Sequence, residues 1–190
     1  MSNPRLRALN IPGALLLCLV FGKVALGQET PTSQVTEGFV NAPVATVWQI
    51  FTTSEGYRTT GVDQAAVDLR LGGTIASRRG MTGTLGDAET RVDEILSYEP
   101  QRMLTVRNRQ MPASDPQRDA VPGTWTVIHF TPSGDDMTHV RIVVLGFRDT
   151  AASQALRQAT GEANRAMLDH VAQRYWPKCK LCAAPDSDQQ

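Results

Sequence analysis

Residues 40–51 read VNAPVATVWQIF, a run that joins an extended segment to an amphipathic helix. The segment 35–41 has an extended pattern. Pro43 then starts a helix, because the N–H that proline lacks would be unpaired at a first helical position anyway. The apolar residues that follow are spaced i, i+3, i+4 and i+7 and share one helix face: Val44, Val47, Trp48 and Phe51. We therefore expect a strand followed by a helix that ends or bends at 54–56.

Short strands and turns dominate the chain downstream of this helix. The expected strands are 66–71, 74–79, 91–98, 103–109, 124–131 and 138–147, each bounded by turn residues. Gly72-Gly73 predicts a two-residue hairpin between the first two strands. The segment 110–123 contains Pro112, Pro116 and Pro122 without periodicity, and we expect either a mobile lid or a disordered loop.

A long helix is expected between Thr150 and Trp176, and Pro177 stops it. Its inward positions step by three or four residues: Leu156, Thr160, Ala163, Met167 and Val171. The order is therefore strand, helix, about six antiparallel strands and a long C-terminal helix. This order is typical of the α+β class.

The composition of the 190-residue chain is that of an ordinary globular protein, with 41% apolar and 20% charged residues. These fractions exclude wholesale disorder, collagen and a multi-span membrane protein. The 19 basic residues balance 19 acidic residues, whereas a nucleic-acid-binding domain would be strongly basic. We expect no nucleic-acid partner, and the length fits one main domain.

Residues 1–27 have the pattern of a secretory signal peptide. Arg5 and Arg7 form a positive start, residues 11–22 carry no charge, and Ala25-Leu26-Gly27 supplies small residues before Gln28. The apolar run is shorter than the roughly 20 residues of a spanning helix, so we expect cleavage and no stable membrane insertion afterwards. The mature protein would be periplasmic or secreted, with a polar leader (28–34), one domain (35–177) and a polar tail (178–190).

The tail contains Cys179-Lys180-Leu181-Cys182. A c-type haem would require a histidine at position 183, where Ala183 stands. A redox-active pair normally opens a helix after a strand, whereas this pair follows a helix-stopping proline. In an oxidising compartment a local disulfide between Cys179 and Cys182 is the favoured interpretation. Closing so short a loop would stabilise the domain only weakly.

Residue patterns for catalysis or metal binding are weak. There is no G-x-S-x-G elbow around a serine nucleophile. His129 and His139 flank the last expected hairpin and could share a metal in one register, but no histidine motif supplies a third ligand. His170 fits a half-buried helix position better than a catalytic base. We therefore predict no catalytic residue, cofactor or metal.

A series of runs in fixed order resembles a known family. The runs are Val40-Asn41-Ala42-Pro43 with Val47-Trp48, Leu69-Arg70-Leu71-Gly72-Gly73-Thr74, Val92-Asp93-Glu94-Ile95, Glu99-Pro100-Gln101-Arg102-Met103-Leu104, and Thr138-His139-Val140-Arg141-Ile142 with Gly146-Phe147. In this order they resemble the helix-grip (START-like, SRPBCC) superfamily, most closely the branch named after the activator of a heat-shock protein's ATPase. Two features depart from that branch. Tyr57-Arg58-Thr59-Thr60 stands where it often has a tryptophan, and its members are usually cytoplasmic.

The resemblance covers residues 35–177. It implies a curved antiparallel sheet of about six to seven strands around the C-terminal helix, with a cavity between them. Members of the superfamily bind apolar ligands, act as cyclases or assist chaperones. Because catalytic residues are not shared across it, the fold indicates where a site lies and not which chemistry occurs there.

We expect an exported protein that binds a small hydrophobic or amphipathic ligand in this cavity. The expected apolar walls are Val47, Trp48, Phe51, Leu69, Leu71, Val140, Ile142, Leu156, Thr160, Ala163 and Met167. The expected polar anchors are Arg78, Arg107 and His129, whose facing the strand pattern leaves open.

Three alternatives use the same fold. The same residues could form a filled core without a cavity. An enzyme of the cyclase or hydrolase kind would place a cluster of titratable side chains in the cavity. A chaperone-like partner of exported proteins would instead show an exposed apolar groove. The sequence leaves the ligand and the oligomeric state open.

Overall fold

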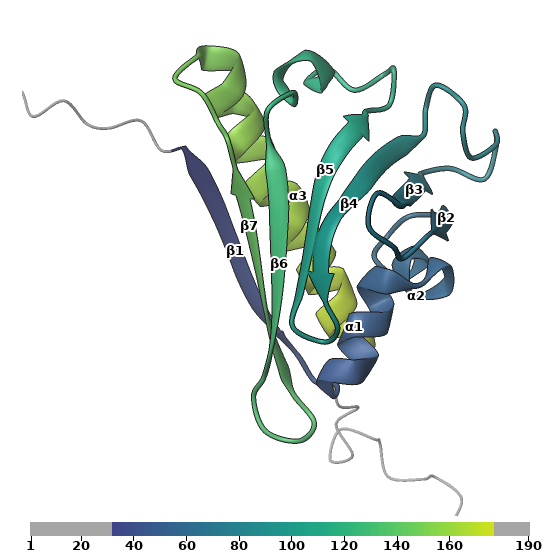
Figure 1. The fold of residues 1–190 in the computed structure, drawn as a ribbon, viewed down its shortest axis with the longest axis vertical. Coiled ribbons are helices and arrows are strands. Elements are labelled where there is room, and N and C mark those ends of the chain that lie inside the picture. Colours follow the sequence, from purple (N-terminus) through teal and green to yellow (C-terminus); the bar gives the residue numbers. More distant parts are fainter. Residues whose placement is uncertain (1–31, 177–190) are drawn as a thin grey trace, which may run out of the picture.

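Residues 32–176 are described by the computed structural model, and they form one curved sheet with three α-helices (Figure 1). The expected signal peptide, Cys179 and Cys182 lie outside the described residues. Residues 33 and 34, which we had assigned to the polar leader, already belong to the first strand.

Seven strands form a single antiparallel sheet in the order β1-β7-β6-β5-β4-β3-β2. The strands are β1 (Ser33–Val40), β2 (Gln64–Val67), β3 (Thr74–Arg78), β4 (Arg91–Glu99), β5 (Met103–Gln110), β6 (Trp125–Pro132) and β7 (Thr138–Leu145). The helices are α1 (Val44–Thr52), α2 (Ser54–Arg58) and α3 (Ala151–Arg174), with a short 3-10 turn, η1 (Arg118–Ala120). The predicted α+β helix-grip fold is confirmed.

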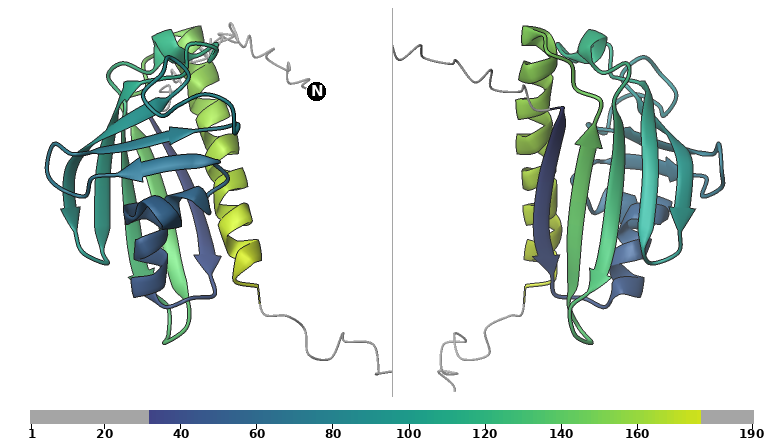
Figure 2. Two further views of the ribbon diagram at one scale, coloured as in Figure 1. Left: turned by 90° about the vertical axis from the view of Figure 1, so that its right-hand side faces the viewer. Right: turned by 60° about the vertical axis from the view of Figure 1, so that its left-hand side comes forward.

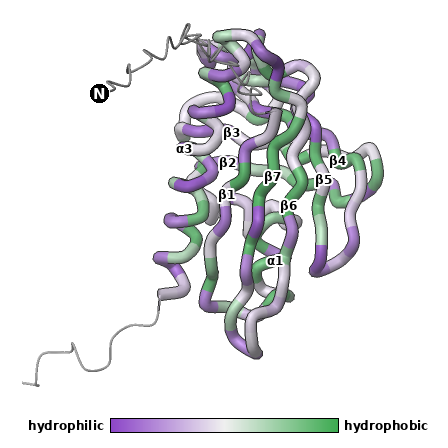
Figure 3. The backbone as a smooth tube through the Cα atoms, turned by 90° about the vertical axis from the view of Figure 1, so that its left-hand side faces the viewer, coloured by the Kyte–Doolittle hydropathy of each residue, from purple (hydrophilic) through white to green (hydrophobic). Residues whose placement is uncertain are grey.

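All three α-helices lie on the same inner face of the curved sheet (Figure 2). Burial alternates along the central strands, so that Leu104 and Val106 of β5 face inward while Arg107 faces outward. Figure 3 shows the corresponding alternation of apolar and polar residues along the strands. One inward face covered by helices is the arrangement expected for an antiparallel sheet with a single apolar face.

Helix α1 fills one half of the space under the sheet. It buries Val47, Ile50 and Phe51, and both Trp48 and Phe51 pack against Phe130 of β6 with ring centroids 5.4 Å and 5.3 Å apart. Helix α2 follows directly, because Thr53 ends α1 in an extended conformation and its side chain then caps α2. This half of the interior is a packed core.

The region between β2 and β3 differs from the predicted two-residue hairpin. Strand β2 ends at Val67, and residues 68–73 form a wider turn. Gly72 N–H donates to the carbonyl of Ile95, and Ile95 N–H donates to the carbonyl of Gly73, so the turn is tied to β4 and not to β2. A Cβ at position 73 would lie 2.1 Å from the carbonyl oxygen of Asp68, which explains why glycine is required there.

Helix α3 is long, and on its side toward β5 and β6 it packs closely against the sheet only near its two ends. Thr150 caps its start by accepting a hydrogen bond from Ser153 N–H. Leu156 near the first end and Leu168 and Val171 near the other are buried. Thr160 is half-buried and Ala163 exposed, so the predicted inward stripe is interrupted at mid-helix. Within residues 32–176, no helix is long and apolar enough to cross a membrane.

Candidate functional site

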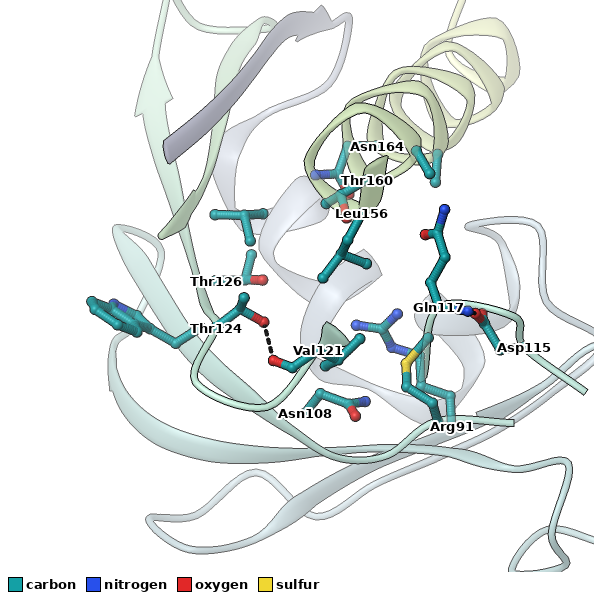
Figure 4. A pocket seen from close by; sticks show the side chains of 15 residues that line it. Arg91, Asn108, Asp115, Gln117, Val121, Thr124, Thr126, Leu156, Thr160 and Asn164 are labelled. Atoms are coloured by element: carbon teal, nitrogen blue, oxygen red, sulfur yellow. Dashed lines mark hydrogen bonds between the residues drawn. The ribbon is translucent and has the colours of Figure 1, made fainter. Parts of the chain in front are cut away.

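A cavity of about 230 Å³ lies where the middle of α3 stands away from the sheet (Figure 4). Its charged lining residues are Arg91 and Asp115, and its amide side chains are Asn108, Gln117 and Asn164. Hydroxyl groups come from Thr124, Thr126 and Thr160. The apolar wall includes Met111, Val121, Val144, Leu156 and Ala163. The cavity therefore has mixed polar and apolar walls.

Among the described residues of this lining, Arg91 is the only cation, and a buried carboxylate holds its side chain. Its Nε donates to Oδ2 of Asp93 at 2.7 Å, and its Nη2 donates to Oδ1 at 3.2 Å. The two residues share a face because alternate residues of a strand point the same way. Asp93 is 3% exposed, whereas the Arg91 side chain keeps 43% of its surface and lines the cavity.

Asn108 completes the coordination of Asp93 from the neighbouring strand. Asp93 of β4 and Asn108 of β5 are register partners. Just before this pair the register shifts, so that one residue step along β4 corresponds to two residue steps along β5. The Asn108 amide donates to Asp93 Oδ1 at 3.0 Å and to the carbonyl of Gln110 at 3.0 Å. The carboxylate thus accepts three hydrogen bonds, which is the usual condition for burying such a group.

These contacts shape the electrostatics of the site. The charge of Asp93 raises the pKa of Arg91 above its ordinary value. Burial raises the pKa of the nearby Tyr57 to about 12, and Asp93 adds to this effect. At neutral pH Tyr57 is therefore uncharged, while Arg91 carries its positive charge.

A folded loop, residues 111–124 between β5 and β6, covers one side of the cavity. Two residues of the loop, Ala120 and Val121, are buried, and η1 contacts α3. Ser114 anchors the tip, because its N–H and Oγ donate to the carboxylate of Glu89 at 3.1 Å and 2.5 Å. A second hollow of about 430 Å³ lies beside this loop, lined by Arg109, Arg118, Asp119 and Pro122 and sharing Asn108, Met111 and Val121 with the first.

The predicted apolar wall residues separate into three groups. Val47, Trp48, Phe51, Val140 and Ile142 belong to the packed core, away from the cavity. Leu69 and Met167 are partly buried against that core, and Leu71 is 67% exposed because its segment forms a turn. Leu156, Thr160 and Ala163 do line the cavity. A ligand-binding role for these three stays a prediction.

The three predicted polar anchors lie elsewhere. Arg107 is on the outer face of the sheet, where it and Arg109 bind Glu94 and lower the pKa of that carboxyl. His129 is also on the outer face, opposite Arg141. Arg78 pairs with Asp87 at 3.2 Å, and its guanidinium lies against Gly83. We therefore replace all three with Arg91, Asn108 and Gln117 as candidate anchors.

The histidine pair does not meet in the observed register. His129 is opposite Arg141, and His139 is opposite Thr131. His139 instead lies 3.6 Å from Glu37 and packs against Phe39. Among residues 32–176, no group of three metal-ligating side chains of the His, Cys, Asp and Glu types comes together.

Sequence reasoning missed Arg91, Asn108 and the loop residues. One signal was present, because Arg91 and Asp93 stand two apart at the start of an expected strand, the spacing that puts both side chains on one face. Nothing in the sequence showed that this face was the inner one. The contributions of Asp115 and Gln117 depend on where the loop folds, which local patterns do not encode.

The comparisons with known proteins agree with this architecture. The sequence model of the family described as activator of Hsp90 ATPase homolog 1-like protein matches residues 41–179. A structure from Mesorhizobium loti is similar with a TM-score of 0.59 at 17% identity, covering 74% of this chain and 94% of that one. A structure from Mycobacterium smegmatis has a TM-score of 0.59 at 18% identity and covers 77% and 92%.

A further similar structure is that of an Aha1 dimer from Colwellia psychrerythraea, with a TM-score of 0.53 at 13% identity, covering 74% of this chain and 96% of that one. No curated protein matches the sequence. At these identities the structures show a common fold alone. The protein is thus of the helix-grip class, and by the family match it belongs to the activator of Hsp90 ATPase homolog 1-like family.

Proposed function

We propose that the protein binds a small amphipathic molecule in the cavity between α3 and the sheet. The observation that carries this proposal is the interruption of close packing at mid-helix, where Thr160 and Ala163 stand over open volume. A helix with leucine or isoleucine at these positions would have larger side chains to fill the space. A family fold that commonly encloses apolar ligands supports the same conclusion.

The size and lining of the cavity limit the ligand. An engineered cavity of about 150 Å³ binds benzene, so the 230 Å³ observed here has room for a substituted ring or a short chain. Leu156, Val121 and Val144 offer apolar contacts, Arg91 and Gln117 offer hydrogen-bond donors, and the side-chain oxygen of Asn108 offers an acceptor. A molecule with one apolar and one polar end fits both walls.

The alternative functions receive less support. An enzyme of the cyclase or hydrolase kind would place a cluster of titratable side chains in the cavity, whereas the described lining has two, Arg91 and Asp115, and Arg91 is already paired with Asp93. A chaperone-like role would favour an exposed apolar groove, whereas α3 and the 111–124 loop cover this cavity. Binding of a small molecule therefore remains the better explanation of the described residues.

Two alanines of α3 provide a matched test. Ala163 and Ala166 are both exposed, but only Ala163 lines the cavity. Phenylalanine at position 163 should fill the cavity mouth and weaken binding of para-fluorobenzyl alcohol, followed by fluorine NMR, at least tenfold. Ala166→Phe should bind the probe as wild type does.

The stability of Ala163→Phe distinguishes an open cavity from a filled core. In open space the new ring should leave the denaturation midpoint unchanged or raise it. In a closely packed site it would cost about 1–3 kcal/mol by overpacking. A loss of that size, together with no probe binding by wild type, would refute the proposal.

We also propose that the protein is exported after cleavage of residues 1–27. Arg5, Arg7, the uncharged run and Ala25-Leu26-Gly27 support this proposal. The ligand would then be taken up outside the cytoplasm.

A further inference from the structure

Some of the Arg91 N–H donors that face the cavity have no hydrogen-bond partner. Nε and Nη2 bind the two oxygens of Asp93, which occupies one edge of the guanidinium. Within residues 32–176, Nη1 has no hydrogen-bond partner, and the side chain keeps 43% of its surface. A guanidinium carries five N–H donors in a fixed fork. The unused donors therefore offer a preset position for an oxygen acceptor.

The Arg91 side chain is held in place, because turning to another partner would break its hydrogen bonds to Asp93. Asp93 takes two of its hydrogen bonds and is fixed in turn by Asn108, whose amide also donates to the carbonyl of Gln110. Breaking a buried ion pair is strongly unfavourable because it leaves an uncompensated charge. The direction of Nη1 is therefore set before a ligand arrives, which lowers the entropy cost of binding.

The charges around the cavity disfavour an anionic ligand. Arg91 is already neutralised by Asp93, and Asp115 brings a second carboxylate to the lining. No lysine occurs between residues 32 and 176 to add a cation. In the adjoining hollow, Arg109 is paired with Glu94 and Arg118 with Asp119. A ligand carboxylate would be the third negative group beside a single cation.

A cationic ligand meets the opposite difficulty. An amidinium or ammonium group has only donors. It could pair with Asp115 elsewhere in the lining, but at this end of the cavity it would face the donors of Arg91. A carbonyl or hydroxyl oxygen can accept from Nη1 without bringing a charge into the site. An uncharged acceptor is thus the group that satisfies Arg91 at the lowest desolvation cost.

We infer that the polar group of the ligand is an uncharged oxygen acceptor, a carbonyl or hydroxyl, bound by Nη1 of Arg91. This inference rests on the proposed function of the cavity. It specifies which amphipathic molecules the site accepts, and it excludes free fatty acids, aromatic acids and amines as preferred ligands.

Three probes of nearly equal shape test the inference: para-fluorobenzamide, para-fluorobenzoate and para-fluorobenzamidine. Binding is followed by fluorine NMR of the probes and by the methyl signal of isotope-labelled Met111, which lines the cavity. Met103 and Met137 lie outside the lining and serve as internal controls. The amide should bind at least about tenfold more tightly than either charged probe, which corresponds to about 1.4 kcal/mol.

The variant Asp115→Asn tests the role of charge. The asparagine oxygen can still accept the hydrogen bond that Gln117 N–H donates to position 115, so the loop should keep its conformation. Removing this charge should improve benzoate binding by about threefold and leave benzamide binding nearly unchanged. Equal effects on the two probes would contradict the charge argument.

The remaining outcomes separate the inference from the proposed function. Tighter binding of benzoate or benzamidine than of benzamide, with Met111 shifted, would overturn the inference and leave a ligand-binding cavity. If neither these probes nor para-fluorobenzyl alcohol shift Met111 in wild type, the proposed function fails, and the inference fails with it.

Discussion

Asp93 is the residue around which the polar half of the interior is organised. A buried carboxylate is costly unless it is paired and hydrogen-bonded, and here Arg91 and Asn108 meet that condition from two adjacent strands. Tyr57 packs nearby on α2 and stays neutral because burial and Asp93 both disfavour its phenolate. Asn164, by contrast, has a buried amide nitrogen with no partner among the described residues.

The raised pKa of Tyr57 predicts a specific loss of stability at alkaline pH. Because the folded state holds the phenol proton more tightly, its contribution is fully present below pH 10 and is lost as pH rises toward about 12. A shift of about two units corresponds to about 2–3 kcal/mol. No lysine lies within residues 32–176, so few other groups there titrate in this range.

Urea denaturation between pH 9 and 12 provides the measurement, with the pH range set by the value for Tyr57. Tyr57→Phe should flatten the dependence of unfolding free energy on pH, while Tyr175→Phe should leave the wild-type slope. The same steep slope in Tyr57→Phe as in wild type would contradict this account.

At the scale of elements, the cavity results from the way α3 meets the sheet. Its ends are fixed by Leu156 on one side and by Leu168 and Val171 on the other. Between them Gly161 lies against the Gln34 side chain of β1, and Leu168 packs over Gly38. Two small residues at these contacts let the helix approach β1 closely, while Thr160 and Ala163 are too short to fill the space on the side toward β5 and β6.

The loop 111–124 is the second element that closes the site, and the Ser114–Glu89 contact holds its tip. Ser114→Ala removes the side-chain hydrogen bond from an exposed position. Such substitutions usually change global stability by no more than about 0.5 kcal/mol. We therefore expect faster amide hydrogen exchange in 111–117 and faster probe release at an unchanged denaturation midpoint.

Ser133→Ala, in the turn between β6 and β7, is the matched control and should leave exchange in 111–117 as in wild type. If Ser114→Ala left exchange and probe release unchanged, the Glu89 contact would not be what holds the loop closed.

At the scale of the whole molecule, the sheet leaves β1 as a long edge, and side chains cover part of it. Arg165 of α3 donates to the carbonyl of Glu37, and Gln34 donates to the carbonyl of Val35. Unpaired edge groups invite pairing with another chain, and covering them is a common protection. Helix α3, which covers the cavity, therefore also protects the β1 edge.

If the protein is exported, its mature form should lack residues 1–27 and contain a disulfide. Intact mass of protein from the exported fraction should correspond to a chain that starts near Gln28. We propose that a disulfide joins Cys179 and Cys182 in an oxidising compartment, and the mass should then rise by about two hydrogen atoms on reduction. Cys179→Ser should show no such change.

Cytoplasmic protein that retains residues 1–27 would contradict export. Two free thiols in protein isolated from outside the cytoplasm would contradict the disulfide alone. Neither outcome bears on the cavity or the sheet, which lie within residues 32–176.

The sequence by itself determined the order of elements, the inward face of the first helix and the family. Periodicity places Val47 and Phe51 inside because each is part of a local apolar stripe, and the structure buries both. Three cavity residues, Leu156, Thr160 and Ala163, were found in the same way, from the spacing along one helix.

Only the tertiary structure decided the polar side of the site. Whether a strand residue faces inward depends on register, so the sequence left the facing of Arg107 and His129 open, and Arg91 was not recognised. Leu71 became exposed because Gly72 and Gly73 pair with β4 through backbone contacts that local patterns do not encode. Local spacing fixes which residues share a face, whereas long-range pairing fixes which face encloses the cavity.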